Sequence, residues 1–133
     1  MQMSFDLHLE LGLEQSIDKI TAALKVEGFG ILTRIDVHST FKEKIDEDFR
    51  EYVILGSCNP RIAWKAFNHD SRVGLLLPCN VTVEAAASEG YDVSIIHPDL
   101  LLGAMGFGDD PVFAAIHKEA LERLDRVAKS LLV

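Results

Sequence analysis

Three residues in this sequence carry side chains that commonly bind metals, exchange electrons or transfer protons, namely Cys58, Cys79 and His97. Each cysteine is followed by an asparagine, so Cys58-Asn59 and Cys79-Asn80 form two similar segments. Thiols and imidazoles hold soft or borderline metal ions, and a thiol beside a base is readily converted to a reactive thiolate. The residue types therefore predict one candidate site, provided that the fold brings the two segments together.

The segment from residue 73 to residue 84 alternates between two faces and predicts a strand around which the chain is organised. The core-facing side of this strand carries Cys79 together with Leu75, Leu77, Val81 and Val83. Pro78 points to the other side and has no amide hydrogen, so it predicts that the strand lies at a sheet edge or contains a bulge.

A hairpin places the second cysteine near the histidine. Residues 86–90 predict a five-residue turn, after which Tyr91 begins a strand that ends at His97. If the hairpin is symmetric, Ala85 pairs with Tyr91 and, in the same register, Cys79 lies opposite His97. Directly opposed side chains have Cβ atoms roughly 5 Å apart, which predicts contact between the thiol and the imidazole.

The first cysteine stands just before a predicted helix. Asn59 and Pro60 have the residue types of a helix cap and a first helical position. The amides and dipole of that helix would lower the pKa of Cys58 if its thiol were exposed. The residue types favour a second interpretation over this one, in which both cysteines are small buried thiols and a backbone carbonyl satisfies His97.

The composition excludes several classes of partner. The chain has 133 residues, of which 48% are hydrophobic and 26% charged, as expected for one folded domain over residues 1–133. Its net charge of -8 opposes nucleic acid and anionic membranes. No segment approaches the roughly 18 apolar residues of a membrane span, so we expect a cytoplasmic protein with reduced thiols.

The hydrophobic pattern predicts an α+β fold. Strands are expected at residues 4–11, 31–37, 52–56, 73–84 and 91–97, and helices at 14–27, 39–49, 60–70 and 109–131. Four strands have one polar face, which predicts an antiparallel sheet of about five strands with helices packed on one face. The strand at 52–56 is apolar on both faces, so it is either central or covered on its second face by another element or subunit.

Aromatic and imidazole side chains elsewhere receive simpler interpretations. We expect Trp64 and Phe67 to be core or subunit contacts. The four remaining histidines lie on polar faces or helix ends without ligand spacing, and we expect them to be solvated: His8, His38, His69 and His117.

Two segments carry a resemblance to a known family. Gly56-Ser57-Cys58-Asn59-Pro60, followed by Gly-Leu-Leu-Leu-Pro-Cys-Asn-Val at residues 74–81, resembles the signature of a bacterial and archaeal family called domain of unknown function 302. Residues 27–30 and the order of elements from residue 4 to residue 131 are also similar to this family. One departure is His97-Pro98, where an Asp-Pro pair is expected, so a role of His97 would be particular to this chain.

The resemblance implies a curved antiparallel sheet like that of the TATA-box-binding protein, with helices on one face, and a homodimer. It implies no activity, because the family has no catalytic residues to carry over and a shared fold does not transfer function. Whether the protein is an enzyme, and which cofactor it uses, are left open.

Three functions are compatible with these observations. The first is a homodimeric binding domain for a small ligand or metal ion. Its candidate ligand-binding residues are Cys58, Asn59, Cys79, Asn80 and His97, and its candidate metal ligands are Cys58, Cys79 and His97. The second is a thiol-dependent redox protein or enzyme that uses Cys58 and Cys79. The third is a structural or protein-interaction module in which the strand at 52–56 forms a subunit surface.

Overall fold

Five strands form one open antiparallel sheet in the computed structural model, which describes residues 2–105 and 109–132. Their order across the sheet is β1-β5-β4-β3-β2. The strands are β1 (Ser4–Leu9), β2 (Gly30–Asp36), β3 (Tyr52–Cys58), β4 (Cys79–Ala85) and β5 (Tyr91–Ile96). The helices are α1 (Leu13–Val26), α2 (Val37–Ile45), α3 (Pro60–His69), the 3-10 helix η1 (Ser71–Leu75), α4 (Pro98–Met105) and α5 (Pro111–Leu131).

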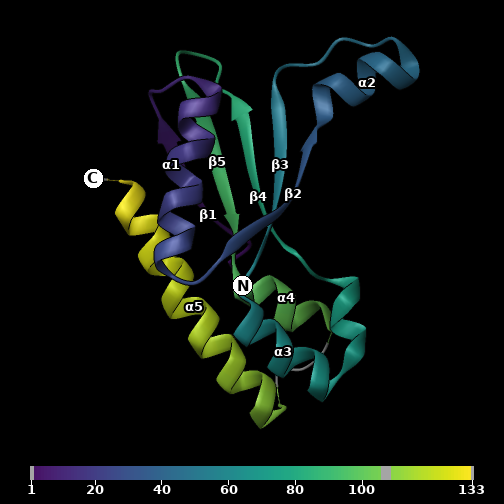
Figure 1. The fold of residues 1–133 in the computed structure, drawn as a ribbon, viewed down its shortest axis with the longest axis vertical. Coiled ribbons are helices and arrows are strands. Elements are labelled where there is room, and N and C mark those ends of the chain that lie inside the picture. The colour runs from purple at the N-terminus through teal and green to yellow at the C-terminus, as the bar shows by residue number, and fades with distance from the viewer. Residues whose placement is uncertain (1, 106–108, 133) are drawn as a thin grey trace.

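The main core lies between one face of the sheet and helices α1 and α5, which pack against each other across it (Figure 1). The inward-facing residues of the strands are almost all aliphatic, and helix residues Ile20, Leu24 and Leu124 are completely buried against them. This arrangement follows from a strand period of two and a helical stripe of apolar residues. The predicted α+β class, with helices on one face of an antiparallel sheet, is confirmed.

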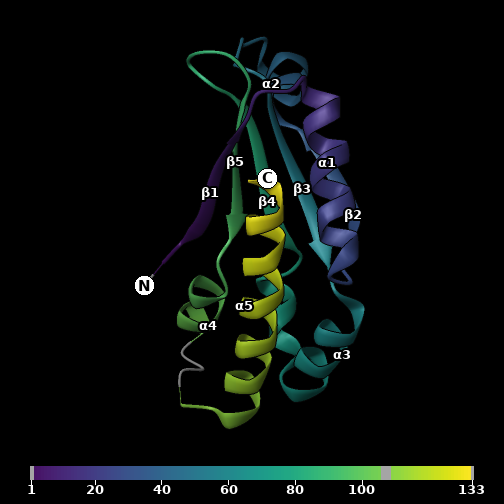
Figure 2. The same ribbon diagram turned by 90° about the vertical axis from the view of Figure 1, so that its left-hand side faces the viewer.

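A second group of helices gathers at one end of the sheet. Figures 1 and 2 show α3, η1, α4 and the first half of α5 below the strands. They enclose a smaller core of Ala66, Val73 and Phe113. Of these elements, α3 and η1 come from the residues between β3 and β4, whereas α4 and α5 follow β5. Because neighbouring antiparallel strands run in opposite directions, the last residue of β3 and the first of β4 lie at the same end of the sheet.

Local sequence signals fix one end of each of two helices. Helix α1 is closed by Gly28, whose φ of 86° is the left-handed conformation that suits glycine after a helix. Helix α5 begins as predicted, because Asp110 accepts hydrogen bonds from the amides of Val112 and Phe113, and Pro111 needs no partner for its nitrogen.

The predicted strand at residues 73–84 is wrong in its first half. Residues 71–75 form η1, which begins where the Asp70 carboxylate accepts a hydrogen bond from the Arg72 amide at 3.0 Å. Leu75 is 83% exposed, so it does not lie on a core-facing strand. Strand β4 starts only after Pro78, and it is the central strand of the sheet, not an edge. Pro78 therefore directly precedes the strand and does not interrupt its ladder of hydrogen bonds.

Strand β2 also departs from the simple pattern. A register shift between Ile31 and Thr33 turns Ile35 to the face opposite α1 and α5, where it lies beside Ile54 of β3. A bulge of this kind reverses the faces of all later residues in the strand. Helix α2 then begins at residue 37, two residues before the predicted start of a helix at 39–49.

Strand β3 is an interior strand of the sheet, because it pairs with β4 on one side and with the edge strand β2 on the other. Part of its outer face is covered by the chain itself, because the α-carbon of Gly56 lies beneath Thr33 and Pro78. Trp64 and Phe67 on α3 are 69% and 44% exposed, so they are not core residues.

Candidate functional site

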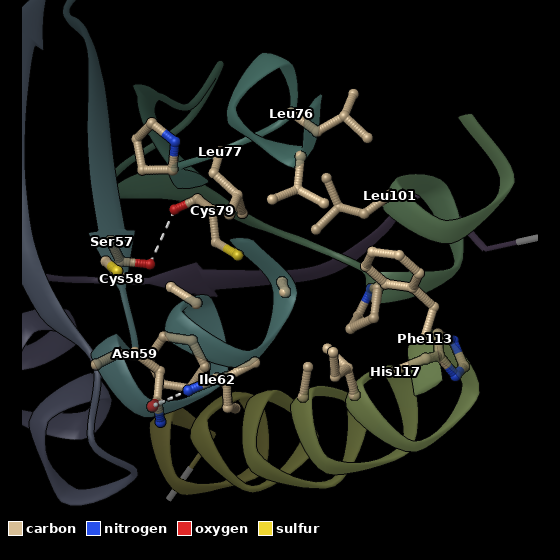
Figure 3. Close-up of a pocket in the computed structure, with 18 residues that line it drawn as sticks. Ser57, Cys58, Asn59, Ile62, Leu76, Leu77, Cys79, Leu101, Phe113 and His117 are labelled. Atoms are coloured by element: carbon tan, nitrogen blue, oxygen red, sulfur yellow. Dashed lines mark hydrogen bonds between the residues drawn. The ribbon is translucent and has the colours of Figure 1, made fainter. Parts of the chain in front are cut away.

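A cavity of about 100 Å³ lies where the end of the sheet meets the helical end of the molecule (Figure 3). Both predicted segments contribute to its wall, through Cys58 at the end of β3 and Cys79 at the start of β4. The rest of the wall is almost wholly apolar and includes Ile62, Leu77, Leu101 and Phe113. None of the described residues that line it is Asp, Glu, Lys or Arg. The cavity is therefore suited to uncharged groups.

Cys79 is the polar side chain nearest the middle of this wall. Its sulfur points into the cavity between Leu77 and Ile62 in Figure 3. Its backbone carbonyl accepts a hydrogen bond from the Ser57 hydroxyl at 2.8 Å, which ties the start of β4 to the end of β3. Burial raises the pKa of the Cys79 thiol to about 12, and the neighbouring Cys58 contributes to the shift. Cys79 is therefore a neutral thiol at physiological pH.

Cys58 is half-buried, so the exposure that a lowered pKa requires is not met. Its pKa is raised, and the cause is burial. The cap of α3 is Asn59, whose Oδ1 accepts a hydrogen bond from the Ile62 amide at 3.2 Å. The Asn59 side chain, and not the Cys58 thiol, therefore accepts the hydrogen bond from the first turn of α3. This geometry disfavours the proposed thiolate chemistry.

The two asparagines have different environments. Asn59 lines the cavity and is 8% exposed, but both ends of its amide are occupied. Besides capping α3, its Nδ2 donates to the carbonyl of Glu27 at 3.1 Å. Asn80 is exposed on the outer face of the sheet, beside Gly56, and does not line the cavity. The two Cys-Asn segments are therefore similar in sequence but not in role, because Asn59 caps a helix and Asn80 is a surface residue.

The structure does not bring His97 to the cysteines. The predicted hairpin register is confirmed, since Ala85 pairs with Tyr91, but pairing of β4 with β5 ends before Cys79. Cys79 instead pairs with Ser57 of β3. His97 is 5% exposed, and its ring stacks on Phe5 with a centroid distance of 4.7 Å. Its Nδ1 accepts a hydrogen bond from the Asp99 amide at 3.1 Å.

The candidate metal ligands therefore do not form a common centre. His97 is absent from the residues that line the cavity, whereas Cys58 and Cys79 face it. Within residues 2–105 and 109–132, no group of three or more His, Cys, Asp or Glu side chains is arranged to hold a metal ion.

His117, which we expect from the sequence to be solvated, instead lines the cavity. Its Nε2 lies 2.7 Å from Oδ1 of Asp99, which joins α5 to α4, and this hydrogen bond lowers the pKa of Asp99. In Figure 3 the His117 imidazole lies at the margin of the cavity, away from the Cys79 sulfur. The signal was present in the sequence, because His117 follows Phe113 by four residues and so shares the apolar stripe of α5.

A second His-Asp pair joins α3 to α5. Nε2 of His69, the last residue of α3, lies 2.7 Å from Oδ2 of Asp110, the cap of α5. The two His-Asp pairs fix α3 and α4 to α5, and these three helices supply nine of the 18 residues that line the cavity. They position the wall and do not reach the thiols.

The raised pKa values predict slow alkylation of both cysteines in the folded protein. The thiolate is the form that reacts with iodoacetamide, so at neutral pH we expect slow labelling of Cys58 and slower labelling of Cys79. Peptide mass spectrometry across a pH series measures the two rates separately, and urea-unfolded protein is the control. A labelling midpoint for Cys58 below the free-thiol value of about 8.5 would contradict this account and favour the thiol-enzyme hypothesis.

Within the described residues, no helix has the length and hydrophobicity that crossing a bilayer requires.

No curated protein matches the sequence. Among solved structures, the chain is similar to an uncharacterised conserved DUF302 protein from Bacillus stearothermophilus, with 27% sequence identity and a TM-score of 0.84 over 97% of this chain and 98% of that chain. The family model described as domain of unknown function DUF302 matches residues 5–131. The chain therefore belongs to the DUF302 family.

Proposed function

We propose that this protein binds a small uncharged molecule, or the apolar end of a larger one, in the cavity beside Cys58 and Cys79. The observation that carries the proposal is the apolar cavity of about 100 Å³ at the junction of the sheet and the helical end. Native cores are packed with few voids larger than a water molecule. An apolar space of this size gives water few hydrogen-bond partners, whereas it gives a hydrocarbon group favourable contacts.

The size and chemistry of the cavity define the ligand class. An apolar cavity of about 150 Å³ admits benzene, which has six non-hydrogen atoms, so by proportion this cavity of about 100 Å³ accommodates a group of roughly four non-hydrogen atoms. A buried charge would lose its hydration without gaining an ionic partner from the lining residues. The two neutral thiols supply polarisable, weakly polar contacts that tolerate apolar ligands. These properties favour binding over thiolate chemistry.

A series of straight-chain alcohols from ethanol to hexanol tests the proposal. Each alcohol is titrated into ¹⁵N-labelled protein, and amide chemical shifts are followed. We expect saturable changes centred on Cys58, Cys79 and the facing part of α5. Affinity should rise about fourfold for each added methylene, corresponding to about 0.8 kcal/mol, until the cavity is full. Changes spread evenly over the surface, without saturation, would contradict the proposal.

A matched pair of variants on α5 locates the binding. Ala120 lines the cavity, whereas Ala115 is exposed on the same helix. Ala120→Leu should fill the cavity and weaken alcohol binding at least tenfold, while Ala115→Leu should bind as the unmodified protein does. Equal affinity in the two variants would show that the alcohols bind elsewhere.

A further inference from the structure

A chain of hydrogen bonds runs from a buried histidine to the wall of the cavity. His97 is 5% exposed, and its Nδ1 accepts a hydrogen bond from the amide of Asp99 at 3.1 Å. The carboxylate of Asp99 lies in turn 2.7 Å from Nε2 of His117, which lines the cavity. The amide of Leu100 donates to the carbonyl of His97 at 3.0 Å and so fixes the same start of α4. The position of Asp99 is therefore defined, and its carboxylate orients the His117 imidazole.

The contact with Asp99 determines which nitrogen of His117 carries hydrogen. A carboxylate can only accept hydrogen bonds, and the hydrogen bond with His117 holds the pKa of Asp99 below its ordinary value of 3.8. Nε2 of His117 is therefore the donor. In a neutral imidazole the second nitrogen is then an acceptor, so Nδ1 of His117 has a lone pair available. Within the described chain Nδ1 makes no hydrogen bond, and 21% of the side chain is exposed.

The other polar side chains in the cavity wall are already used or form only weak hydrogen bonds. The Ser57 hydroxyl donates to the Cys79 carbonyl, and both ends of the Asn59 amide are occupied. The two thiols are neutral and are weak donors. Nδ1 of His117 is therefore the strongest unused side-chain acceptor among the described residues of the wall. Figure 3 shows the imidazole at the margin of the cavity, away from the Cys79 sulfur.

Two other His-Asp pairs in the described chain do not have this arrangement. His69 makes the same kind of contact with Asp110 at 2.7 Å, but His69 does not line the cavity. His8 lies 2.9 Å from Asp92 at the exposed surface of the sheet. Of these three histidines, only His117 presents an oriented imidazole to the apolar cavity.

We propose that Nδ1 of His117 accepts a hydrogen bond from the polar end of the ligand, so that the ligand is a small alcohol whose apolar part fills the cavity. Asp99 is the positioning residue, because it holds the imidazole and does not line the cavity. A carboxylate is excluded, since it has no hydrogen to donate and would meet the negative charge of Asp99. The inference rests on the proposed binding function and names the class of ligand that this function takes.

Two ligands of similar size test this assignment, 1-propanol and 1-chloropropane, of which only the alcohol has a hydrogen to donate. Each is titrated into the unmodified protein and into His117→Gln, with amide chemical shifts as the readout. Glutamine places its amide near the position of Nε2 and can keep the contact with Asp99, but it has no acceptor at the position of Nδ1. We expect His117→Gln to weaken 1-propanol binding about fivefold, as for one lost hydrogen bond, and to change 1-chloropropane binding less than about twofold.

His69→Gln is the matched control, because it makes the same replacement in a His-Asp pair that does not line the cavity. It should leave the affinities for both ligands unchanged. Imidazole ¹⁵N shifts provide a readout that needs no ligand, and in the unmodified protein they should show hydrogen on Nε2 of His117 and none on Nδ1. Asp99→Asn can donate to Nε2, so it should place hydrogen on Nδ1 in part of the molecules.

The outcomes separate this assignment from the proposed function. If both ligands bind, and His117→Gln weakens them equally or not at all, the assignment of His117 is overturned and the proposed function stands. If neither ligand binds the unmodified protein, the proposed function is overturned, and this inference with it. Hydrogen on Nδ1 of His117 in the ligand-free protein would also overturn the assignment. Unchanged binding of 1-chloropropane by His117→Gln would show that this variant keeps the folded cavity.

Discussion

Replacing Asn59 with alanine is expected to lower the free energy of unfolding by about 2 to 3 kcal/mol. Asn59 is 8% exposed and connects three parts of the chain. Its Oδ1 caps α3 through the Ile62 amide at 3.2 Å, and its Nδ2 donates to the Glu27 carbonyl at 3.1 Å. The substitution removes the cap, which contributes about 1 kcal/mol, and leaves a buried amide without its acceptor, which adds a similar cost.

The second Cys-Asn segment provides the control. Asn80→Ala removes the same amide from an exposed position on the outer face of the sheet, and we expect a change within about 0.5 kcal/mol. Urea unfolding followed by circular dichroism gives both values. If both substitutions were equally tolerated, the role assigned to Asn59 in joining β3, α3 and the end of α1 would be wrong.

Replacing Gly56 with alanine is expected to destabilise the protein by about 2 to 3 kcal/mol through overpacking. A Cβ atom at this position would overlap Oγ1 of Thr33 and lie 2.8 Å from Cγ of Pro78. The threonine hydroxyl can rotate, but the proline ring is rigid and directly precedes Cys79. The added methyl group therefore displaces the start of β4 and, with it, one wall of the cavity.

A second strand glycine tests whether the effect is steric. In the described chain no atom lies within 4 Å of a Cβ built on Gly30, so Gly30→Ala should change stability by less than about 0.5 kcal/mol. Differential scanning calorimetry compares the two variants. We also expect Gly56→Ala, and not Gly30→Ala, to shift the amide resonance of Cys79. Equal melting temperatures would mean that the sheet accommodates the methyl group without cost.

Elements that depend on neighbouring residues could be predicted from the sequence. The end of α1 at Gly28, the start of α3 at Asn59-Pro60 and the start of α5 at Asp110-Pro111 each have a cap whose chemistry is local. The register of the β4–β5 hairpin followed from its turn for the same reason. These signals require no knowledge of distant packing.

Features that depend on distant packing could not be predicted from the sequence. The alternation of Leu75 and Leu77 is as compatible with a strand as with the 3-10 helix and loop that the structure has, so the local pattern does not distinguish them. The bulge in β2 has no glycine or proline to mark it. The incorrect strand at Leu75 and Leu77 and the unpredicted bulge in β2 both involve apolar residues that lie at the surface or in the cavity wall and not in the main core.

The candidate site was predicted in part for a topological reason. Cys58 and Cys79 line one cavity because one ends a strand and the other begins the antiparallel neighbour. His97 was assigned by extending the hairpin register two residues past the point where pairing of β4 with β5 stops. His117 could not be assigned from its polarity, which suggests solvent, whereas its position on the apolar stripe of α5 directs it to the cavity.

Diffraction from crystals held under xenon gas tests the central claim most directly. Xenon enters apolar cavities of this size because dispersion forces alone retain it. We expect one xenon atom in van der Waals contact with Cys79, Ile62 and Phe113, and none in crystals of Ala120→Leu. Xenon absent from this position in the unmodified protein, with α3 or α5 filling the space instead, would contradict the proposed binding site.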